Sequence, residues 1–303
     1  MKKFSFITVA AVFAALTIAS CDKNPNSGTQ KPPDDPKPKP DVFVNKTTET
    51  STFLLEELTG IRCGYCPDGH KKADRLADSL FPGKFFVINV HTDYYGEPKS
   101  GYLTDLRSDF GEALDTYSKL SGYPAGMINR RVFSSYSMKV GGAAMDRYNW
   151  EKAVNSIVGE STYVNVAAKT TINSADRTLT CKVQAYYTDD ATTPINNINV
   201  AVLQNELIAE QASGSVFYPE RVTPDGKYRH MHVLRHLITG QWGETIDIEK
   251  KKDNLYEKTF TWTIPADIRT LPILLENVEV LVFITEGEKT PVAKVCKSSI
   301  EIK

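Results

Sequence analysis

Residues 52–67 read TFLLEELTGIRCGYCP. The run from Thr52 to Leu58 is mostly apolar and predicts a buried strand. The pair Cys63 and Cys66 follows it, and Pro67 is a residue that the first turn of a helix tolerates. We therefore expect Cys63 at a helix N-terminus, where free N–H groups and the helix dipole stabilise a thiolate. Cys66, one turn further on, is placed to close a disulfide with it.

Strand-like and helix-like segments continue to alternate up to residue 160. A helix is predicted after Cys66 because apolar residues recur at helical spacing, and Gly83 stands where this helix would stop. Beyond it we predict a buried strand at 85–90, helices at 103–120 and 145–158, and a short strand at 127–129. This alternation predicts an α/β domain over residues 51–160.

The pattern changes at Ser161, where strands follow one another without helices. The predicted strands are 163–167, 179–185, 200–203, 256–264, 278–284 and 292–302. We expect an all-β, immunoglobulin-like sandwich over residues 161–303. Cys181 and Cys296 lie in its second and last strands, and the simplest pairing joins them in a structural disulfide. Four cysteines allow three connectivities, so the other two pairings stay open.

The amino terminus has the features of a cleaved export signal over residues 1–20. Lys2 and Lys3 precede an uncharged apolar run, and small residues lead up to Cys21. The residues Ile18-Ala19-Ser20-Cys21 resemble the lipobox of bacterial lipoproteins, which implies acyl chains on Cys21 that anchor the chain to a membrane. The alternative is an ordinary signal peptide with an incidental cysteine. Residues 21–50 form the predicted anchor and tether, because 22–40 are Pro-rich and lack aliphatic and aromatic side chains.

The net charge and the positions of the histidines limit the classes of ligand that we expect. The chain of 303 residues has a net charge of −1, which gives no electrostatic reason to expect nucleic-acid binding. Cys63, Cys66, His70 and His91 offer donors for copper or zinc. We favour a solvated His70 and a His91 packed at a strand end, and we predict no metal and no cofactor. His230, His232 and His236 are expected on one polar face of a strand from 229 to 238.

Three features in order resemble thioredoxin-like proteins. Gly64-Tyr65 between the cysteines is like the pair in periplasmic disulfide isomerases, and Glu57 stands six residues before Cys63, like the buried acid of thioredoxins. The segment Gly122-Tyr123-Pro124-Ala125 resembles their cis-proline loop. The resemblance implies that Cys63 is the nucleophile, Cys66 resolves, Glu57 relays a proton and Pro124 shapes the substrate groove. The long stretch between Val90 and Pro124, and Arg62 in place of an aromatic residue, depart from this pattern.

Most of the mature chain is similar to the Bacteroidetes lipoprotein family related to outer membrane protein twenty-eight. The lipobox, the T-G-x-x-C-x-x-C-P motif at 59–67, the strand end Val90-His91-Thr92 and the segment 122–124 carry the likeness. The family implies a thioredoxin-like domain and a β-domain on the outer membrane, and it is described as a surface adhesin or receptor.

We therefore expect an outer-membrane lipoprotein, on the periplasmic or the cell-surface side, that exchanges thiols and disulfides with other proteins. The alternative is a redox-silent adhesin or binder of an extracellular ligand. Glu56 and Glu57 should point to opposite faces of their strand. Burial of Glu57 beneath the helix should raise its pKa.

Overall fold

A parallel strand–helix–strand unit forms around the two cysteines, as the sequence predicts. The computed structural model describes residues 41–287, 289 and 291–303. Strand β1 (Phe53–Thr59) leads into helix α1 (Cys66–Asp74), which a π-helical segment, η1 (Arg75–Leu80), extends. Strand β2 (Phe85–His91) then runs parallel to β1, with Phe53 opposite Phe85 and Thr59 opposite His91. The predicted signal peptide, Cys21 and the Pro-rich part of the tether lie outside the described residues.

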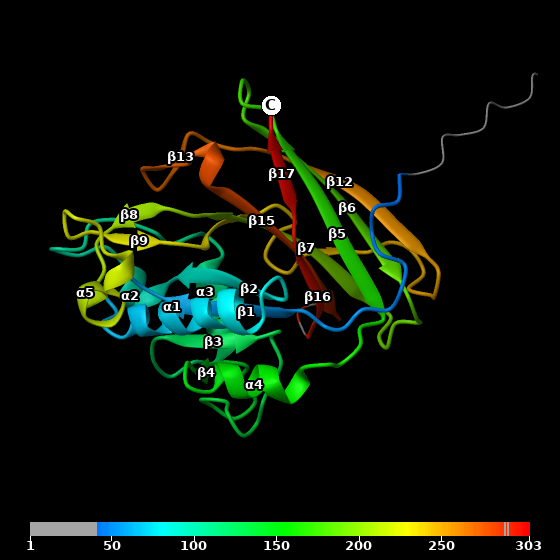
Figure 1. Cartoon of the computed structure of the whole chain (residues 1–303), viewed down its shortest axis with the longest axis horizontal. Helices are drawn as coiled ribbons and strands as arrows, with labels where there is room; N and C mark the ends of the chain where they lie inside the picture. Colours follow the sequence, from blue (N-terminus) through cyan, green and yellow to red (C-terminus); the bar gives the residue numbers. More distant parts are fainter. Residues whose placement is uncertain (1–40, 288, 290) are drawn as a thin grey trace, which may run out of the picture. The chain divides into compact units, whose positions relative to one another are not determined.

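The sheet around β1 continues into the carboxyl-terminal half of the chain (Figure 1). On one side of β1 lie β3 (Ala125–Ile128) and β4 (Met145–Asp146), both in antiparallel pairings. On the other side, beyond β2, follow β10 (Val233–Leu237), β7 (Asn196–Gln204), β15 (Val278–Glu286) and β16 (Val292–Lys297), and β11 (Glu244–Thr245) also pairs with β7. Strand β10 joins the halves, because it pairs in parallel with β2 and antiparallel with β7.

This shared sheet spans the predicted domain boundary at residue 160. Residues 42–303 form one compact unit, and strands from both predicted domains contribute to a single nine-stranded sheet. The sequence pattern marks where helices stop alternating with strands. It does not show that β10 adds to the edge of β2, because that pairing joins residues far apart in the chain.

A second sheet covers part of the first. Its four strands are, in spatial order, β12 (Leu255–Thr263), β6 (Thr178–Tyr187), β5 (Val164–Ile172) and β17 (Ser299–Ile302). Buried apolar side chains of β5, β6 and β12 pack with those of β7 and β15 in one hydrophobic core. Burial of this apolar surface holds the two sheets together. The fold is thus mixed α/β and rich in strands, and the predicted sandwich shares one of its sheets with the α/β half.

Helices cover both faces of the sheet where β1 and β2 lie. Helices α1 and α4 (Trp150–Ile157) pack on one face, where Trp150 is fully buried. Helix α3 (Gly111–Ser118) packs on the other face through Leu114, against residues of β1, β2, β7 and β15. All seven residues of β1 are buried as a result. Short elements complete the fold: α2 (Asp93–Gly96), β13 (Asp267–Ile268), β14 (Leu271–Pro272) and η3 (Leu275–Asn277).

Two predicted helices start later than the apolar pattern suggests. Residues 103–110 are not helical, and α3 begins only at Gly111. The predicted helix from 145 begins at Trp150, because residues 145–146 form β4. In both places an aspartate side chain accepts a hydrogen bond from the backbone two residues on: Asp105 from Arg107, and Asp146 from Tyr148. Such local bonds compete with helical ones.

A long insertion between β7 and β10 folds over the cysteine end of the sheet. Residues 205–232, which we call the β7–β10 connection, contain β8 (Leu207–Ala209), α5 (Gly214–Phe217), η2 (Pro219–Arg221) and β9 (Tyr228–His230). Strands β8 and β9 pair as an antiparallel ribbon. Among the described residues, no helix is long and apolar enough to cross a membrane.

Candidate functional site

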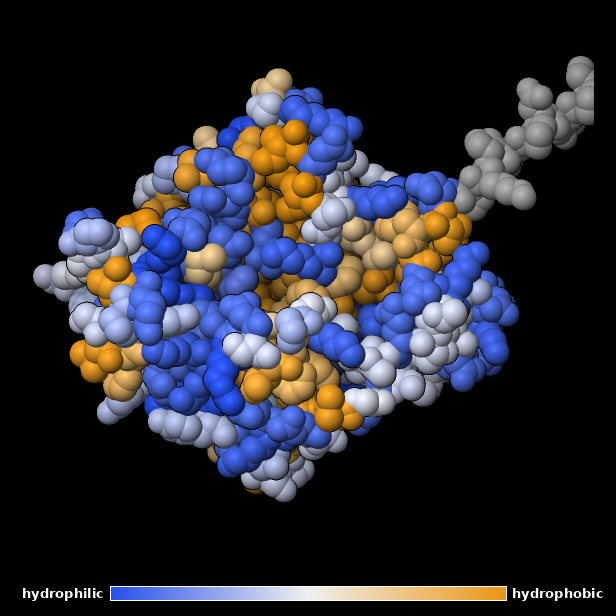
Figure 2. Space-filling model, viewed as in Figure 1, coloured by the Kyte–Doolittle hydropathy of each residue, from blue (hydrophilic) through white to orange (hydrophobic). Residues whose placement is uncertain are grey.

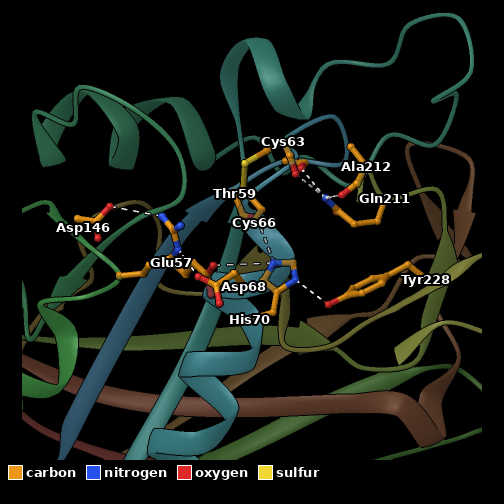
Figure 3. Close-up of a disulfide and its surroundings, with 12 residues drawn as sticks. Glu57, Thr59, Cys63, Cys66, Asp68, His70, Asp146, Gln211, Ala212 and Tyr228 are labelled. Atoms are coloured by element: carbon orange, nitrogen blue, oxygen red, sulfur yellow. Dashed lines mark hydrogen bonds and ion pairs between the residues drawn. A yellow bond between two sulfur atoms is a disulfide. The ribbon is translucent and has the colours of Figure 1, made fainter. Parts of the chain in front are cut away.

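Cys63 and Cys66 form a disulfide between the end of β1 and the first turn of α1 (Figure 3). Their Cα atoms are 5.4 Å apart. Pro67 occupies the first turn of α1, where its missing N–H costs no helical hydrogen bond. The structure therefore forms the predicted strand–cysteine–helix arrangement.

Both cysteines are buried, and the β7–β10 connection contacts the loop that precedes α1. Cys63 is 3% exposed and Cys66 is 0% exposed. The side-chain amide of Gln211 donates a hydrogen bond to the Cys63 carbonyl at 3.0 Å, and the backbone N–H of Ala212 donates to the Ile61 carbonyl at 2.8 Å. These contacts hold the connection against the cysteine loop (Figure 3).

Pro124 lies against α1, as the thioredoxin-like resemblance implies. The Tyr123–Pro124 peptide bond is cis. A Cβ atom built on Gly69 of α1 would approach the Pro124 ring at 3.1 Å and a Glu57 carboxylate oxygen at 2.4 Å. The glycine therefore lets Pro124 and Glu57 both lie directly beneath the helix that begins at Cys66.

The two glutamates of β1 point to opposite faces, as predicted. Glu56 forms a buried ion pair with Arg130, in which the guanidinium donates two bonds of 2.7 Å. Glu57 is fully buried, and neither of its carboxylate oxygens accepts a hydrogen bond within the described part of the chain. Burial, followed by the nearby Asp74 carboxylate, raises the pKa of Glu57 well above its usual value.

A cluster of buried histidines lies beside Glu57, and sequence reasoning missed it. His70 is 2% exposed, which corrects the expectation that it is solvated. Its ring lies 6.4 Å from that of His230, which lies 5.3 Å from that of His91, measured between centroids. Burial lowers the pKa of all three, to about 3 for His230, so the cluster is neutral. A signal for part of it was the position of His70, four residues after Cys66 on the same helix.

The three carboxyl-terminal histidines do not share one strand face, which corrects that expectation. The predicted strand is interrupted, because His232 adopts a positive φ of 53° between β9 and β10. His230 belongs to the buried cluster, His232 pairs with Glu279 at 2.9 Å, and His236 stacks on Trp262. The described residues contain no group of three or more His, Cys, Asp or Glu arranged to hold a metal ion.

The predicted disulfide between Cys181 and Cys296 is not formed, since both residues are free thiols. They lie in β6 and β16, which belong to different sheets. Burial raises the pKa of Cys296 to about 12, and the neighbouring Cys181 contributes to the rise. The structure therefore places the two thiols near each other without a bond.

The outward face of α1 is charged. Asp68, Lys71, Lys72 and Arg75 line open grooves there, and Figure 2 shows a mainly hydrophilic surface over this part of the molecule. Asp68 also accepts a bond of 2.6 Å from the Arg147 guanidinium. This charged face is distinct from the buried face of α1, which carries His70 and Ala73.

Comparison with known proteins gives a family and a related fold. The family model described as outer membrane protein Omp28 matches residues 111–303. The structure of HBP35 of Porphyromonas gingivalis is similar, with a TM-score of 0.61 and 19% identity, over 84% of this chain and 77% of that one. A domain of the outer membrane lipoprotein Omp28 from Porphyromonas gingivalis matches 47% of this chain and 91% of its own, with 16% identity and a TM-score of 0.32.

A search of curated proteins gives no match. The likeness to HBP35 shows a shared fold, whereas the family match covers the larger part of the sequence, from α3 to the carboxyl terminus. The chain therefore belongs to the Omp28 family of outer membrane proteins.

Proposed function

We propose that this protein is a thiol–disulfide oxidoreductase with a thioredoxin-like site, attached to the outer membrane through acyl chains on Cys21. The observation that carries the proposal is the arrangement at the start of α1. The Cys63–Cys66 disulfide lies at the start of the helix, the cis peptide before Pro124 lies against it, and Glu57, whose pKa is raised by burial, lies beneath it. A purely structural disulfide does not require a buried carboxyl group at this place.

The chemistry follows from these positions. A substrate thiolate attacks the Cys63 sulfur, the Cys63–Cys66 bond breaks, and Cys66 leaves with the electron pair. Glu57, held as the neutral acid, donates its proton to the Cys66 thiolate. A second substrate thiolate then attacks the mixed disulfide and releases Cys63, so that the substrate is oxidised and the protein is reduced. In the reverse direction the Cys63 thiolate is the nucleophile and Cys66 resolves the intermediate.

The β7–β10 connection bears directly on this proposal. It contacts the loop that carries Cys63, and both cysteines are buried, so a protein substrate reaches the Cys63 sulfur only after a local rearrangement. The same burial favours the second candidate function, a redox-silent adhesin or ligand-binding lipoprotein in which the disulfide stabilises the loop. We also propose that the first half is thioredoxin-like and the second half immunoglobulin-like. This fold assignment is compatible with either function.

The test is a thiol-exchange assay on the purified full chain, with insulin reduction and RNase refolding as substrates. We expect turnover by the wild type, loss of turnover in Cys63→Ser, and mixed disulfides with partner proteins trapped on Cys63 in Cys66→Ala. The double variant Cys181→Ser/Cys296→Ser is the control, and it should keep full activity because those thiols lie in other strands. Absence of turnover in the wild type would reject the oxidoreductase and leave the binding function.

A further inference from the structure

A layer of polar side chains lies beneath the disulfide, at the carboxyl ends of β1 and β2. Glu57 and Thr59 of β1 pair in register with Asn89 and His91 of β2, so all four point to the same face of the sheet. Helix α1 places His70 over this layer, and the β7–β10 connection adds Tyr228 and His230. Each of these side chains except Thr59 and Asn89 titrates.

Hydrogen bonds connect part of this layer into a row. The Nε2 atom of His70 lies 3.9 Å from a carboxylate oxygen of Glu57 and shares a hydrogen bond of 3.1 Å with the Thr59 hydroxyl. Its other ring nitrogen, Nδ1, is 3.0 Å from the hydroxyl of Tyr228 (Figure 3). Glu57, His70 and Tyr228 therefore follow one another from beneath Cys66 toward the β7–β10 connection.

An imidazole in this position passes a proton without holding a charge. Its two nitrogens act as donor and acceptor at once, so a proton given up at one is replaced at the other. The geometry fits the tautomer in which the Tyr228 hydroxyl donates to Nδ1 and Nε2 carries the hydrogen beside Glu57 and Thr59. Burial lowers the pKa of His70 well below its usual value, which keeps the ring neutral and able to act in this way.

We propose that His70 is the proton-relay partner of Glu57, with Tyr228 as the next member of the row. This inference rests on the proposed oxidoreductase function. When Glu57 gives its proton to the Cys66 thiolate, it becomes a buried carboxylate with no hydrogen bond from the described residues. The Nε2–H of His70 then moves to Glu57, the Tyr228 hydroxyl proton moves to Nδ1 and a proton from solvent replaces it on Tyr228 in one concerted movement, so that neither an imidazolate nor a tyrosinate forms. The movement leaves His70 in its other tautomer, and the reverse half-reaction, in which Cys66 gives up its proton, returns the protons along the row and restores the starting state.

The charged groups around the row set its pH response. Asp68 and Asp74 of α1 face Glu57 together with Arg147 and, from the β7–β10 connection, Arg221. His70 is faced by Arg221 and by His91, His230 and His232. The two arginines lower the pKa of Glu57, and the two aspartates raise it. Loss of the His70 N–H removes a donor 3.9 Å from Glu57 that would stabilise the carboxylate once it forms, so it should raise the pKa of Glu57 further.

The experiment measures the reduction rate of the Cys63–Cys66 disulfide by a small dithiol between pH 5 and 9. His70→Gln keeps a polar side chain but replaces the imidazole ring, with its two proton-exchanging nitrogens, by an amide, and Tyr228→Phe removes only the hydroxyl group. We expect His70→Gln to slow exchange on the order of tenfold and to shift the inflection of the pH profile upward. Tyr228→Phe should slow exchange by a smaller factor. His236→Gln, which changes a histidine stacked on Trp262, is the matched control and should leave the profile unchanged.

A double variant separates a relay from a structural role. In a Glu57→Gln background the His70→Gln change should have no further effect on the rate, because the relay acts only through Glu57. Equal slowing by His70→Gln with and without Glu57 would overturn the relay, as would unchanged profiles in both His70→Gln and Tyr228→Phe. A wild type that shows no exchange at all would instead overturn the oxidoreductase function, and the relay with it.

Discussion

Glu56 and Glu57 are neighbours in β1, and their buried carboxyl groups have different surroundings. Glu56 accepts two hydrogen bonds from the guanidinium of Arg130, with which it forms a buried ion pair. Glu57 accepts no hydrogen bond in the part of the chain that the structure describes, so desolvation raises its pKa well above the usual value. The alternation of a strand predicts that the two side chains separate, but it does not say which of them meets an arginine.

Stability should therefore depend on pH through Glu57. Its folded pKa is raised above the usual value of 4.5, so between the two values the folded chain keeps a proton that the unfolded chain loses. In this window the free energy of unfolding falls by about 1.4 kcal/mol per pH unit for one group. Glu57→Gln cannot lose a proton, so its stability relative to the wild type should rise as the pH increases from 4.5 through the folded pKa. Urea unfolding at several pH values checks this.

Glu56→Gln is the matched comparison for that measurement. It leaves the Arg130 charge buried without its partner carboxylate, so we expect a loss of about 3–5 kcal/mol. The loss should be present across the neutral range, unlike the pH-dependent effect at Glu57. A stability difference between Glu57→Gln and the wild type that stays constant with pH would mean that Glu57 is ionised in the folded protein.

At the scale of the element, the side chains beneath α1 explain why a glycine occupies the middle of this helix. A glycine inside a helix costs stability relative to alanine, yet Gly69 is buried in the middle of α1. The space that a methyl group would occupy is taken by Glu57 and Pro124. The close approach of helix, carboxyl and proline ring therefore outweighs helix propensity at this position.

Gly69→Ala should destabilise the protein, although it improves the helix propensity of the segment. A Cβ at 2.4 Å from a Glu57 oxygen forces a shift of α1 or of β1, with an expected cost of about 1–3 kcal/mol. Gly122→Ala is the control, because a Cβ on Gly122 meets nothing within 4 Å. Thermal unfolding of the two variants measures the difference, and a Gly69→Ala variant as stable as the wild type would show that α1 has room to move.

At the scale of the whole molecule, one sheet joins the two halves of the chain. The face of this sheet against α3 buries apolar residues of β1 and β2 together with those of β7, β10 and β15. Residues 42–160 by themselves would expose this face and the free edge of β2. The cysteine site also depends on the β7–β10 connection, which comes from the carboxyl-terminal half.

The whole of residues 42–303 should therefore unfold in one cooperative transition. Denaturant unfolding followed by circular dichroism and by tryptophan fluorescence should give coincident curves. A fragment of residues 42–160 should lack a cooperative transition, because β2 loses its neighbour β10 and the sheet loses much of its core. Two separate transitions in the full protein, or a stably folded fragment, would restore the division at residue 160.

The local features of this protein could be predicted from its sequence. Apolar runs and the C-x-x-C spacing located β1, α1, β2 and most later strands, and the offset of Glu57 from Cys63 identified the buried acid. These features depend on residues near one another in the chain, where spacing and propensity act directly.

The contacts between distant segments became apparent only in the folded chain. The addition of β10 to β2 merged two predicted domains, and the β7–β10 connection carried Tyr228 and His230 to His70, more than a hundred residues away in sequence. No periodicity marks such contacts, because they arise from the burial of surfaces that distant segments share. For the same reason His70 changed from an expected surface residue to the centre of a buried polar layer.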